Sequence, residues 1–527
     1  MSPRALRWLL IVLCTALALV IAGNSALAIA LPDIAEDLSA DQVDLTWIID
    51  AYALTFAALL LPAGIAADRF GRRTVLVTGL LVFGAAGVAS AFAPDPTWLI
   101  VWRAIAGVGA AATFPVTLSA LVDSYPPERR SFAVAVWSGV SGGGAVLGTL
   151  VAGALLEVSG WGSVQLVFGA AALVLLPAVA VLVRQDRNPN LPLDPWGAAW
   201  AVVALAGIVF GVVEAPRLGW TSPETLSALG VGLGALAAFI VHELRTAAPS
   251  LDVRLFRSRG LSAGSLLVSL QFFASLGLFV LAPQYLQLVR DFSPLQAATA
   301  LLTIAIGVGS GTGLAPRLLE RRGARLPGAV GLAAMAVGFA LLAWSIAQPA
   351  DADALTRWGV PAVGLIAFGF GFGLAITPGT VLIIDGLPPE RRSVASAVND
   401  ITREVGGVLG IAVLSSVLVS RYRDDIAPAL AQLPPPLVEP VRDSAAAALA
   451  IAAEAGPQGA ALASAATDAF AAGLSAALWI GAAVLAVSAL GCALLAPAHP
   501  QGTVAAQTPE TKDVAGASDA AEAVPQA

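Results

Sequence analysis

Long apolar runs follow one another along almost the whole chain, separated by short polar segments. A helix of about 20 apolar residues crosses a hydrocarbon core of about 30 Å. The first run reaches Leu31, longer than the apolar core of about 7–15 residues in a signal peptide, so we expect a spanning helix rather than a cleaved leader. The pattern predicts fourteen spans, near 6–30, 45–66, 74–93, 97–121, 133–156, 164–183, 196–214, 224–243, 261–288, 294–316, 327–347, 359–384, 394–419 and 472–496.

Composition agrees with a membrane protein. Of the 527 residues, 58% are hydrophobic and 12% charged, and the mean hydropathy is +0.83. A soluble domain carries about 25% charged residues, so we expect most of the surface to face the lipid bilayer. The net charge of −7 gives no reason to expect a nucleic-acid partner.

Cysteine and histidine are scarce. Cys14 and Cys492 lie in separate apolar runs, which predicts no disulfide framework, and the histidines are His242 and His499. Their spacing offers no metal site, and no Gly-x-x-x-x-Gly-Lys-Ser/Thr phosphate loop is present. The sequence therefore indicates no enzyme, no metal and no cofactor.

A repeat relates the two halves of the chain. Pro-Pro-Glu-Arg-Arg-Ser occurs at Pro126–Ser131 and again at Pro388–Ser393, an offset of 262 residues. The register continues into the next helix, where Gly144 and Gly148 recur as Gly406 and Gly410. Parallel repeats of this kind build a large class of secondary transporters.

Arginines give the orientation of the spans. With the N-terminus inside, nineteen arginines fall in inner segments and six in outer loops. This bias agrees with the positive-inside rule and predicts that both termini are cytoplasmic. The inner membrane is the expected location.

The repeat and the spans together define the predicted domains. We expect an N-terminal six-helix bundle over 1–185, a central two-helix insertion over 186–258 and a C-terminal six-helix bundle over 259–497. The last bundle contains an external, Ala-rich segment at 421–470, for which a helical flap is expected. The polar stretch 498–527 is predicted to be a disordered cytoplasmic tail.

Several motifs add specificity. The loop after the second span reads Gly64-Ile-Ala-Ala-Asp68-Arg69-Phe-Gly71-Arg72-Arg73, in which the acid and the arginines can latch the inner ends of two helices. Span 4 contains Arg103-Ala-Ile-Ala-Gly-Val-Gly-Ala-Ala, and span 5 contains Gly144, Gly148 and Gly153. Span 2 opens with Trp-Ile-Ile-Asp50-Ala-Tyr52, and span 13 with Asn-Asp400-Ile-Thr-Arg403-Glu404.

These motifs resemble those of the major facilitator superfamily, in its fourteen-span drug:proton antiporter branch. The resemblance implies an all-α membrane protein of two six-helix bundles plus a central helix pair. It also implies that the Gly64–Arg73 loop governs the conformational switch and that Arg103 couples proton movement to substrate. Three positions depart from the branch: Gly23, with Asn24 beside it, stands where span 1 usually carries an aspartate, Thr149 replaces a proline, and Ala106 replaces a glutamine.

Ionisable residues inside spans are costly and are therefore functional candidates. The candidates for proton coupling or recognition of substrate charge are Asp50, Arg103, Asp400, Arg403 and Glu404. Asp400 and Arg403, three residues apart, could form a structural pair that leaves Glu404 to exchange a proton for a cation. Alternatively, Glu404 also pairs with Arg403. Arg103 is expected to meet Asp50 or a substrate anion, or else a backbone carbonyl or Glu404.

Aromatic and amide side chains supply the candidate cavity lining. Aromatic rings attract organic cations, and buried amides must find partners. The candidates are Asn24, Tyr52, Phe56, Phe114, Gln271, Phe272 and Tyr285.

The resemblance thus implies proton-coupled efflux of lipophilic, cationic drugs or toxic metabolites by alternating access, and we expect a monomer acting on a small lipophilic substrate. Two alternatives stay open. One is an exporter of a neutral or amphiphilic compound, such as a host antibiotic or a lipid. The other is a membrane sensor or assembly partner without transport.

Overall fold

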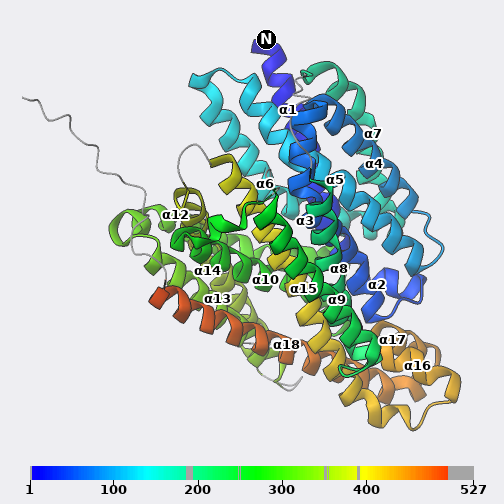
Figure 1. Ribbon diagram of the computed structural model, residues 1–527. Coiled ribbons are helices and arrows are strands. Elements are labelled where there is room, and N and C mark those ends of the chain that lie inside the picture. The colour runs from blue at the N-terminus through cyan, green and yellow to red at the C-terminus, as the bar shows by residue number, and fades with distance from the viewer. Residues whose placement is uncertain are drawn as a thin grey trace, which may run out of the picture.

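The helices form two bundles that meet at one end (Figure 1). The computed structural model describes residues 3–185, 194–246, 249, 251–348, 353, 355–387 and 392–495. The predicted tail, 498–527, lies outside these residues, as does part of the second Pro-Pro-Glu-Arg-Arg-Ser copy. Within them, thirteen helices are long and apolar enough to cross a membrane. Helix α6 (Pro127–Leu156) is also long, but its apolar part among these residues, Gly144–Leu156, is shorter than a membrane span. The total of fourteen spans therefore stays a prediction.

Six long helices and one short one make the first bundle. The bounds are α1 Pro3–Ser25, α2 Leu27–Asp37, α3 Gln42–Phe70, α4 Arg72–Ser90, α5 Pro96–Ser124, α6 Pro127–Leu156 and α7 Gly162–Leu182. The second bundle contains α10 Arg259–Leu288, α11 Pro294–Leu301, α12 Thr303–Arg322, α13 Arg325–Ile346, α14 Val360–Asp385, α15 Arg392–Leu430 and α18 Ala460–Leu495.

The parallel repeat is visible in how the helices pack. In the first bundle α1 contacts α6, α3 contacts α5, and α4 contacts both α5 and α7. The second bundle repeats this set as α10 with α15, α12 with α14, and α13 with α14 and α18. The pairing of spans 5 and 13 read from the 262-residue offset therefore corresponds to α6 and α15 in equivalent places.

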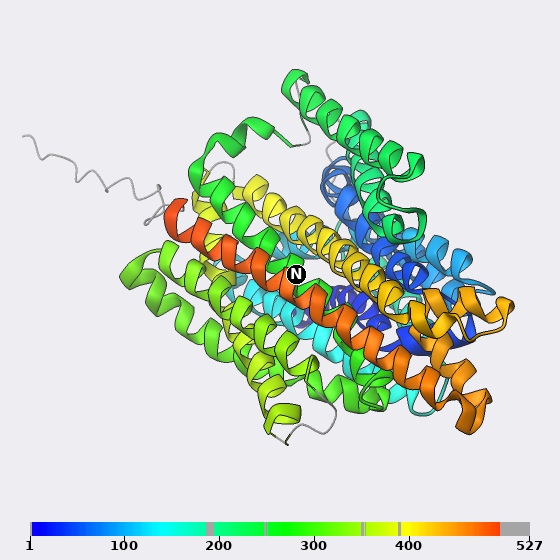
Figure 2. The ribbon, with the colours of Figure 1, turned by 90° about the horizontal axis from the view of Figure 1, so that it is seen from below.

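A central pair lies between the bundles in the sequence. Helices α8 (Pro195–Leu218) and α9 (Pro223–Arg245) pack mainly against each other, and α8 also contacts α3 of the first bundle and α15 of the second. Viewed from below, the pair lies at the edge of the assembly (Figure 2). A short 3-10 helix, Val253–Arg257, leads from it into α10.

Two short helices, α16 (Pro435–Asp443) and α17 (Ala445–Glu454), form a flap against α2, α15 and α18. We call this the flap end of the bundles and the opposite end the N-terminal end. Tyr422 donates its hydroxyl to the carbonyl of Val441, 2.9 Å away, and Arg423 pairs with Asp443 at 2.8 Å. The segment after span 13 is therefore helical and packed on the second bundle.

Helix boundaries differ from the sequence prediction in four places. The first predicted span breaks at Ala26 into α1 and α2, and Ser25 there donates to the carbonyl of Ala145 on α6. The predicted span 294–316 is interrupted at Leu302. Helix α15 runs on to Leu430, and α18 begins at Ala460 rather than 472. The extension of α15 carries several charged residues, which ends the strongly apolar run, whereas the added turns of α18 are rich in alanine.

Candidate functional site

Arg103 is the largest fully buried side chain of the described residues, with 2% of it exposed. Its Nε donates to the carbonyl of Ile48 at 3.0 Å, and Nη2 donates to Oδ1 of Asn24 at 2.7 Å. Its guanidinium carbon lies 4.3 Å from the centre of the Tyr52 ring. A neutral amide, a backbone carbonyl and an aromatic face thus hold this cation. The expected contact with Asp50 is absent from these interactions, and the backbone-carbonyl alternative is present.

Gly23, beside Asn24, packs closely against α4. A Cβ built on Gly23 would lie 3.0 Å from the ring of Phe83 on α4. An aspartate would therefore require that ring to move. Asn24, one residue on, supplies the polar contact to Arg103 instead.

Asp50 is fully buried, and neither of its carboxyl oxygens has a hydrogen-bond partner in the part of the chain that is described. It lies one turn from Trp47, on the same face of α3. Trp47 donates its indole N–H to Glu214 of α8 at 3.0 Å. Helix α3 also packs on α15, so Asp50 belongs to the helix of the first bundle that contacts both the central pair and the second bundle.

The charges of α15 occupy a partly buried stretch. Arg403 donates through Nη2 to the hydroxyl of Thr380 at 3.4 Å and lies 5.4 Å from the centre of the Phe272 ring. Asp400 accepts from the amide of Asn399 at 3.3 Å. In the described residues no ion pair forms between Asp400 and Arg403, so the expected structural pair is replaced by contacts to a hydroxyl, an amide and a ring.

Glu404 faces the first bundle. Ile401, one turn earlier on α15, packs against the hydrophobic core of that bundle. Glu404 is partly buried, and it is near enough to Tyr52 of α3 to act on it electrostatically. The carboxyl group therefore lies at the seam between the bundles, across from the Arg103–Tyr52 stack.

A row of aromatic rings continues from that stack. Tyr52 and Phe56 have ring centres 6.0 Å apart, Phe56 and Phe114 are 5.6 Å apart edge to face, and Phe114 meets Trp137 at 5.6 Å. Tyr52 and Phe56 are buried, whereas Phe114 is partly exposed. Trp137 donates its indole N–H to the hydroxyl of Thr117. The row presents Phe114 as its accessible member.

The candidates on α10 lie at different depths. Gln271 is fully buried and donates to the carbonyl of Phe372 at 2.7 Å, while its Oε1 has no partner within the described residues. Phe272 meets Phe372 at 5.5 Å. Tyr285 lines a cavity, but one inside the second bundle rather than at the seam.

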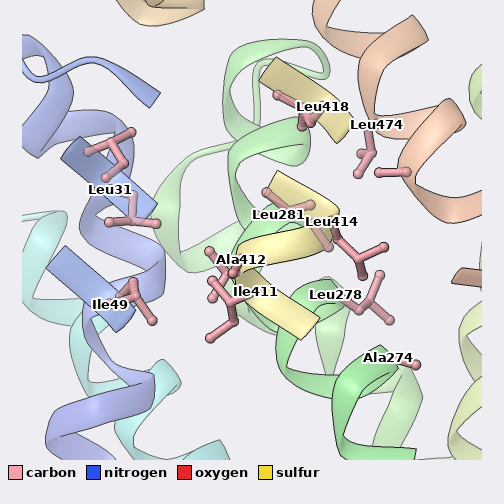
Figure 3. Close-up of a cluster of buried hydrophobic side chains, with 14 of the residues drawn as sticks. Leu31, Ile49, Ala274, Leu278, Leu281, Ile411, Ala412, Leu414, Leu418 and Leu474 are labelled. Atoms are coloured by element: carbon pink, nitrogen blue, oxygen red, sulfur yellow. The ribbon is translucent and has the colours of Figure 1, made fainter. Parts of the chain in front are cut away.

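The seam is sealed in its flap-end half by apolar side chains. Figure 3 shows Leu31 of α2 and Ile49 of α3 on one side, with Ile411 and Ala412 of α15 on the other. Hydrogen bonds reinforce this half, since Gln287 of α10 donates to the carbonyl of Ile29 at 2.9 Å. The structure is therefore closed between the bundles at the flap end.

The segment Gly64–Arg73, expected to be a loop, is helical except at Gly71. Gly64–Phe70 forms the last turns of α3, and Arg72 and Arg73 begin α4, at the N-terminal end. Gly71 has φ of +100°, in the region that favours glycine, and Arg72 pairs with Asp68 at 3.3 Å. Arg69 lies over the ring of Phe70, Arg73 follows in the first turn of α4, and a Cβ on Gly64 would meet nothing within 4 Å.

Gln185, which the sequence did not single out, anchors this loop to the end of α7. Its side-chain amide donates to the carbonyl of Phe70 at 3.0 Å and to the hydroxyl of Thr74 at 2.8 Å, and its Oε1 accepts from the Thr74 N–H. A glutamine after an apolar span gives no motif signal, so only the fold reveals the contact.

The glycines of α6 allow close helix approach. A Cβ on Gly148 would lie 2.5 Å from Cα of Ala22 on α1, and one on Gly153 would lie 3.1 Å from Cα of Leu295 on α11. Gly144 has more room, with Ile21 at 3.4 Å. The repeat partner of Gly148 behaves alike, because a Cβ on Gly410 would lie 2.0 Å from the Phe273 carbonyl oxygen. Small residues at such contacts are typical of membrane helix packing.

A second group of residues missed in the sequence links the central pair to both bundles. Glu214 of α8 accepts from Trp47 and pairs with Arg217 at 2.7 Å, and Arg217 lies 4.0 Å from Asp41 at the start of α3. On the other side, Ser416 of α15 donates to the Val212 carbonyl at 3.0 Å. Glu214 falls near the predicted end of a span, where a charge reads as an ordinary loop residue.

Two repeated six-helix bundles with charged groups at their seam define the class of secondary transporters. Comparison with known protein families agrees with this class. The family described as the Major Facilitator Superfamily matches residues 13–411 of the chain. The chain therefore belongs to this superfamily and is a multi-pass membrane transporter, not an enzyme. Its assignment to the fourteen-span branch stays a prediction.

Similar proteins are named for resistance and efflux. The chain is 34% identical to the puromycin resistance protein of Streptomyces alboniger, over 78% of this chain and 81% of that protein. It is 33% identical to the multidrug efflux pump LfrA of Mycolicibacterium smegmatis, over 79% and 82%. A bacterial homologue of the lysosomal transporter Spinster, in an inward-facing conformation, shares the fold with a TM-score of 0.67 at 17% identity, covering 94% of this chain and 98% of that one.

Proposed function

We propose that this chain exports lipophilic, cationic drugs or toxic metabolites across the cytoplasmic membrane in exchange for protons, by alternating access. Relatives named for drug resistance and multidrug efflux support the drug class. The proton is the coupling ion, no other cofactor takes part, and the monomer works in the lipid bilayer with both termini cytoplasmic.

The observation that carries the proposal is the isolation of Asp50. A buried carboxyl group without a hydrogen-bond partner is far less costly when it holds a proton than when it is charged. Asp50 is carried by α3, the helix of the first bundle that packs on both α8 and α15, and its neighbour Ile49 lies at the closed flap-end half of the seam. Separation of the bundles at this external end would admit water, release the exported cation and let a proton from outside bind Asp50. Release of that proton to the cytoplasm, after closure here and opening at the N-terminal end, would complete the exchange.

Glu404 supplies the complementary charge. It is partly buried and lies within electrostatic range of Tyr52, whose ring stacks on Arg103. A carboxylate beside aromatic rings suits an organic cation, which gains from both the charge and the ring faces. Phe114 and Phe272, both partly exposed, are the ring candidates for this contact.

The test is ethidium efflux from proteoliposomes under an imposed proton gradient. We expect uphill export by the wild type and its loss in Asp50→Asn, and in Glu404→Gln. The matched controls are Asp424→Asn and Glu439→Gln, which remove the same charge from exposed positions and should export normally. No gradient-driven ethidium movement by the wild type would overturn the cationic-drug proposal, and absence of any flux would favour the non-transporting sensor.

A neutral or amphiphilic substrate is the second candidate, and one observation favours it. Position 23 has little room for an acid because of Phe83, and Arg103 is held by a neutral amide. The first helix therefore contributes no negative charge to the seam. Export of a neutral compound that is independent of the proton gradient would support this candidate.

A further inference from the structure

A cavity of about 220 Å³ lies inside the second bundle at the flap end. Its wall is almost entirely apolar and is contributed by α10, α11, α13, α14 and α18. Seven leucines contribute to it: Leu278, Leu286, Leu301, Leu342, Leu365, Leu474 and Leu478. An apolar cavity of about 150 Å³ stays dry and accepts hydrocarbon, so this larger one is suited to part of an acyl chain.

Two arginines lie at the same cavity. Arg290, just beyond the end of α10, donates through both Nη atoms to the carbonyl of Arg357 at 3.4 Å, and its guanidinium lies 4.2 Å from the centre of the Trp358 ring. Trp358 in turn stacks on Phe292 at 5.7 Å. The rings and the guanidinium form a rim above the leucine wall.

Neither arginine is neutralised within the described chain. No acidic side chain lies within ion-pair distance of Arg290 or Arg357 there. Asp353, four residues before Arg357, accepts instead from the backbone N–H of Thr356 at 3.0 Å. The two guanidinium groups at this apolar cavity are therefore available to an anion from outside the described chain.

We propose that this cavity binds an anionic phospholipid of the surrounding bilayer, with an acyl chain among the leucines and the phosphate at Arg290 and Arg357. A guanidinium group can donate two parallel hydrogen bonds to the oxygens of one phosphate. Arginine and tryptophan at the ends of spanning helices lie at the depth of lipid headgroups. Because all walls belong to one bundle, the lipid would move with that bundle and would not be the transported cargo, which as a cation would be repelled by the rim.

The experiment measures lipid binding to the purified full-length chain in detergent by native mass spectrometry. We expect dioleoyl phosphatidylglycerol to bind about tenfold more tightly than dioleoyl phosphatidylcholine. Arg290→Gln/Arg357→Gln should abolish that preference. Arg245→Gln/Arg257→Gln, which removes two exposed arginines elsewhere, should keep it.

Further arms separate the acyl chain from the phosphate. Ala362→Phe fills the cavity without changing charge and should weaken phosphatidylglycerol binding about tenfold. Glycerol phosphate, which lacks the chain, should not displace the lipid. Arg357→Gln alone serves if the double variant fails to fold, since the hydrogen bonds recorded for Arg357 are made by its backbone and would survive the substitution. Equal phosphatidylglycerol binding by the wild type and the arginine variants, or by the wild type and Ala362→Phe, would overturn the proposal, as would displacement by glycerol phosphate.

Discussion

Arg103 Nη2 and Asn24 Oδ1 lie 2.7 Å apart, so that a neutral amide of α1 holds the buried cation of α5. This contact occurs next to Gly23, where the drug:proton antiporter branch usually carries an acid. The seam of this transporter therefore contains a cation on α5 that is held by neutral groups, and carboxyl groups on α3 and α15 that form no ion pair with it within the described residues.

Removing the amide should leave Arg103 short of one strong acceptor. We expect Asn24→Ala to lower the free energy of unfolding by about 1.5–3 kcal/mol, the range for a hydrogen bond to a charged group. Asn24→Asp keeps the shape and adds a negative charge, so it should be at least as stable as the wild type. Thermal unfolding in detergent measures both, and equal loss in the two variants would show that shape rather than the acceptor matters.

Gly71 and Gln185 should behave as a coupled pair. Gly71→Ala places a Cβ 2.3 Å from the Gln185 amide nitrogen at a φ of +100°, a sparsely populated backbone conformation that costs about 1–3 kcal/mol by itself. Gln185→Ala removes the obstacle but also the bonds to Phe70 and Thr74. The double variant should thus lose less stability than the sum of the single losses. Strict additivity in thermal unfolding would refute this coupling.

Substitution of glycine by alanine should change the free energy of unfolding in opposite directions at contacting and at open positions. Gly148→Ala and Gly410→Ala force a Cβ into neighbouring backbone, and we expect each to cost about 1–3 kcal/mol. Gly64→Ala meets nothing within 4 Å and should stabilise α3 by up to about 1 kcal/mol. Unfolding midpoints measured side by side decide the matter. A stabilised Gly148→Ala would mean that α1 and α6 pack more loosely.

Asp33 on α2, outside the candidate spans, should make stability depend on pH. Burial, with smaller contributions from Asp37 and Glu36, raises its pKa to about 6. A raised pKa means that the folded state disfavours the charged carboxylate of Asp33. The resulting loss of folding stability is therefore absent at low pH, grows from about pH 4 and is complete above about pH 6. Asp33→Asn should therefore raise the unfolding midpoint at about pH 7.5 and less at about pH 4.5. A gain independent of pH would contradict this.

The sequence predicted the bundles and the repeat because both leave local signals. Apolar runs of spanning length mark the helices, and the 262-residue offset marks the equivalent places of α6 and α15. The helical break at Ala26 and the extension of α15 to Leu430 had no such signal, because bonds to other helices and a polar composition decide them.

Site contacts were harder to predict for a related reason. Proximity in sequence suggested that Asp400 would hold Arg403, yet the side chain turns toward Thr380 of α14 and the ring of Phe272. The bond from Arg103 to Asn24 joins residues 79 positions apart. Motifs name the residues that matter, whereas their partners depend on which helices the fold brings together.

The bonds of α8 have a consequence for the timing of the transport cycle. Its carbonyls at Val212 and Pro216 accept from Ser416 and Arg423 of one bundle, while Glu214 accepts from Trp47 of the other. When the flap end opens, α8 cannot keep both sets, so one must break before the bundles part. We therefore expect the resting protein to dwell in the state closed at that end, with opening there slower than closing.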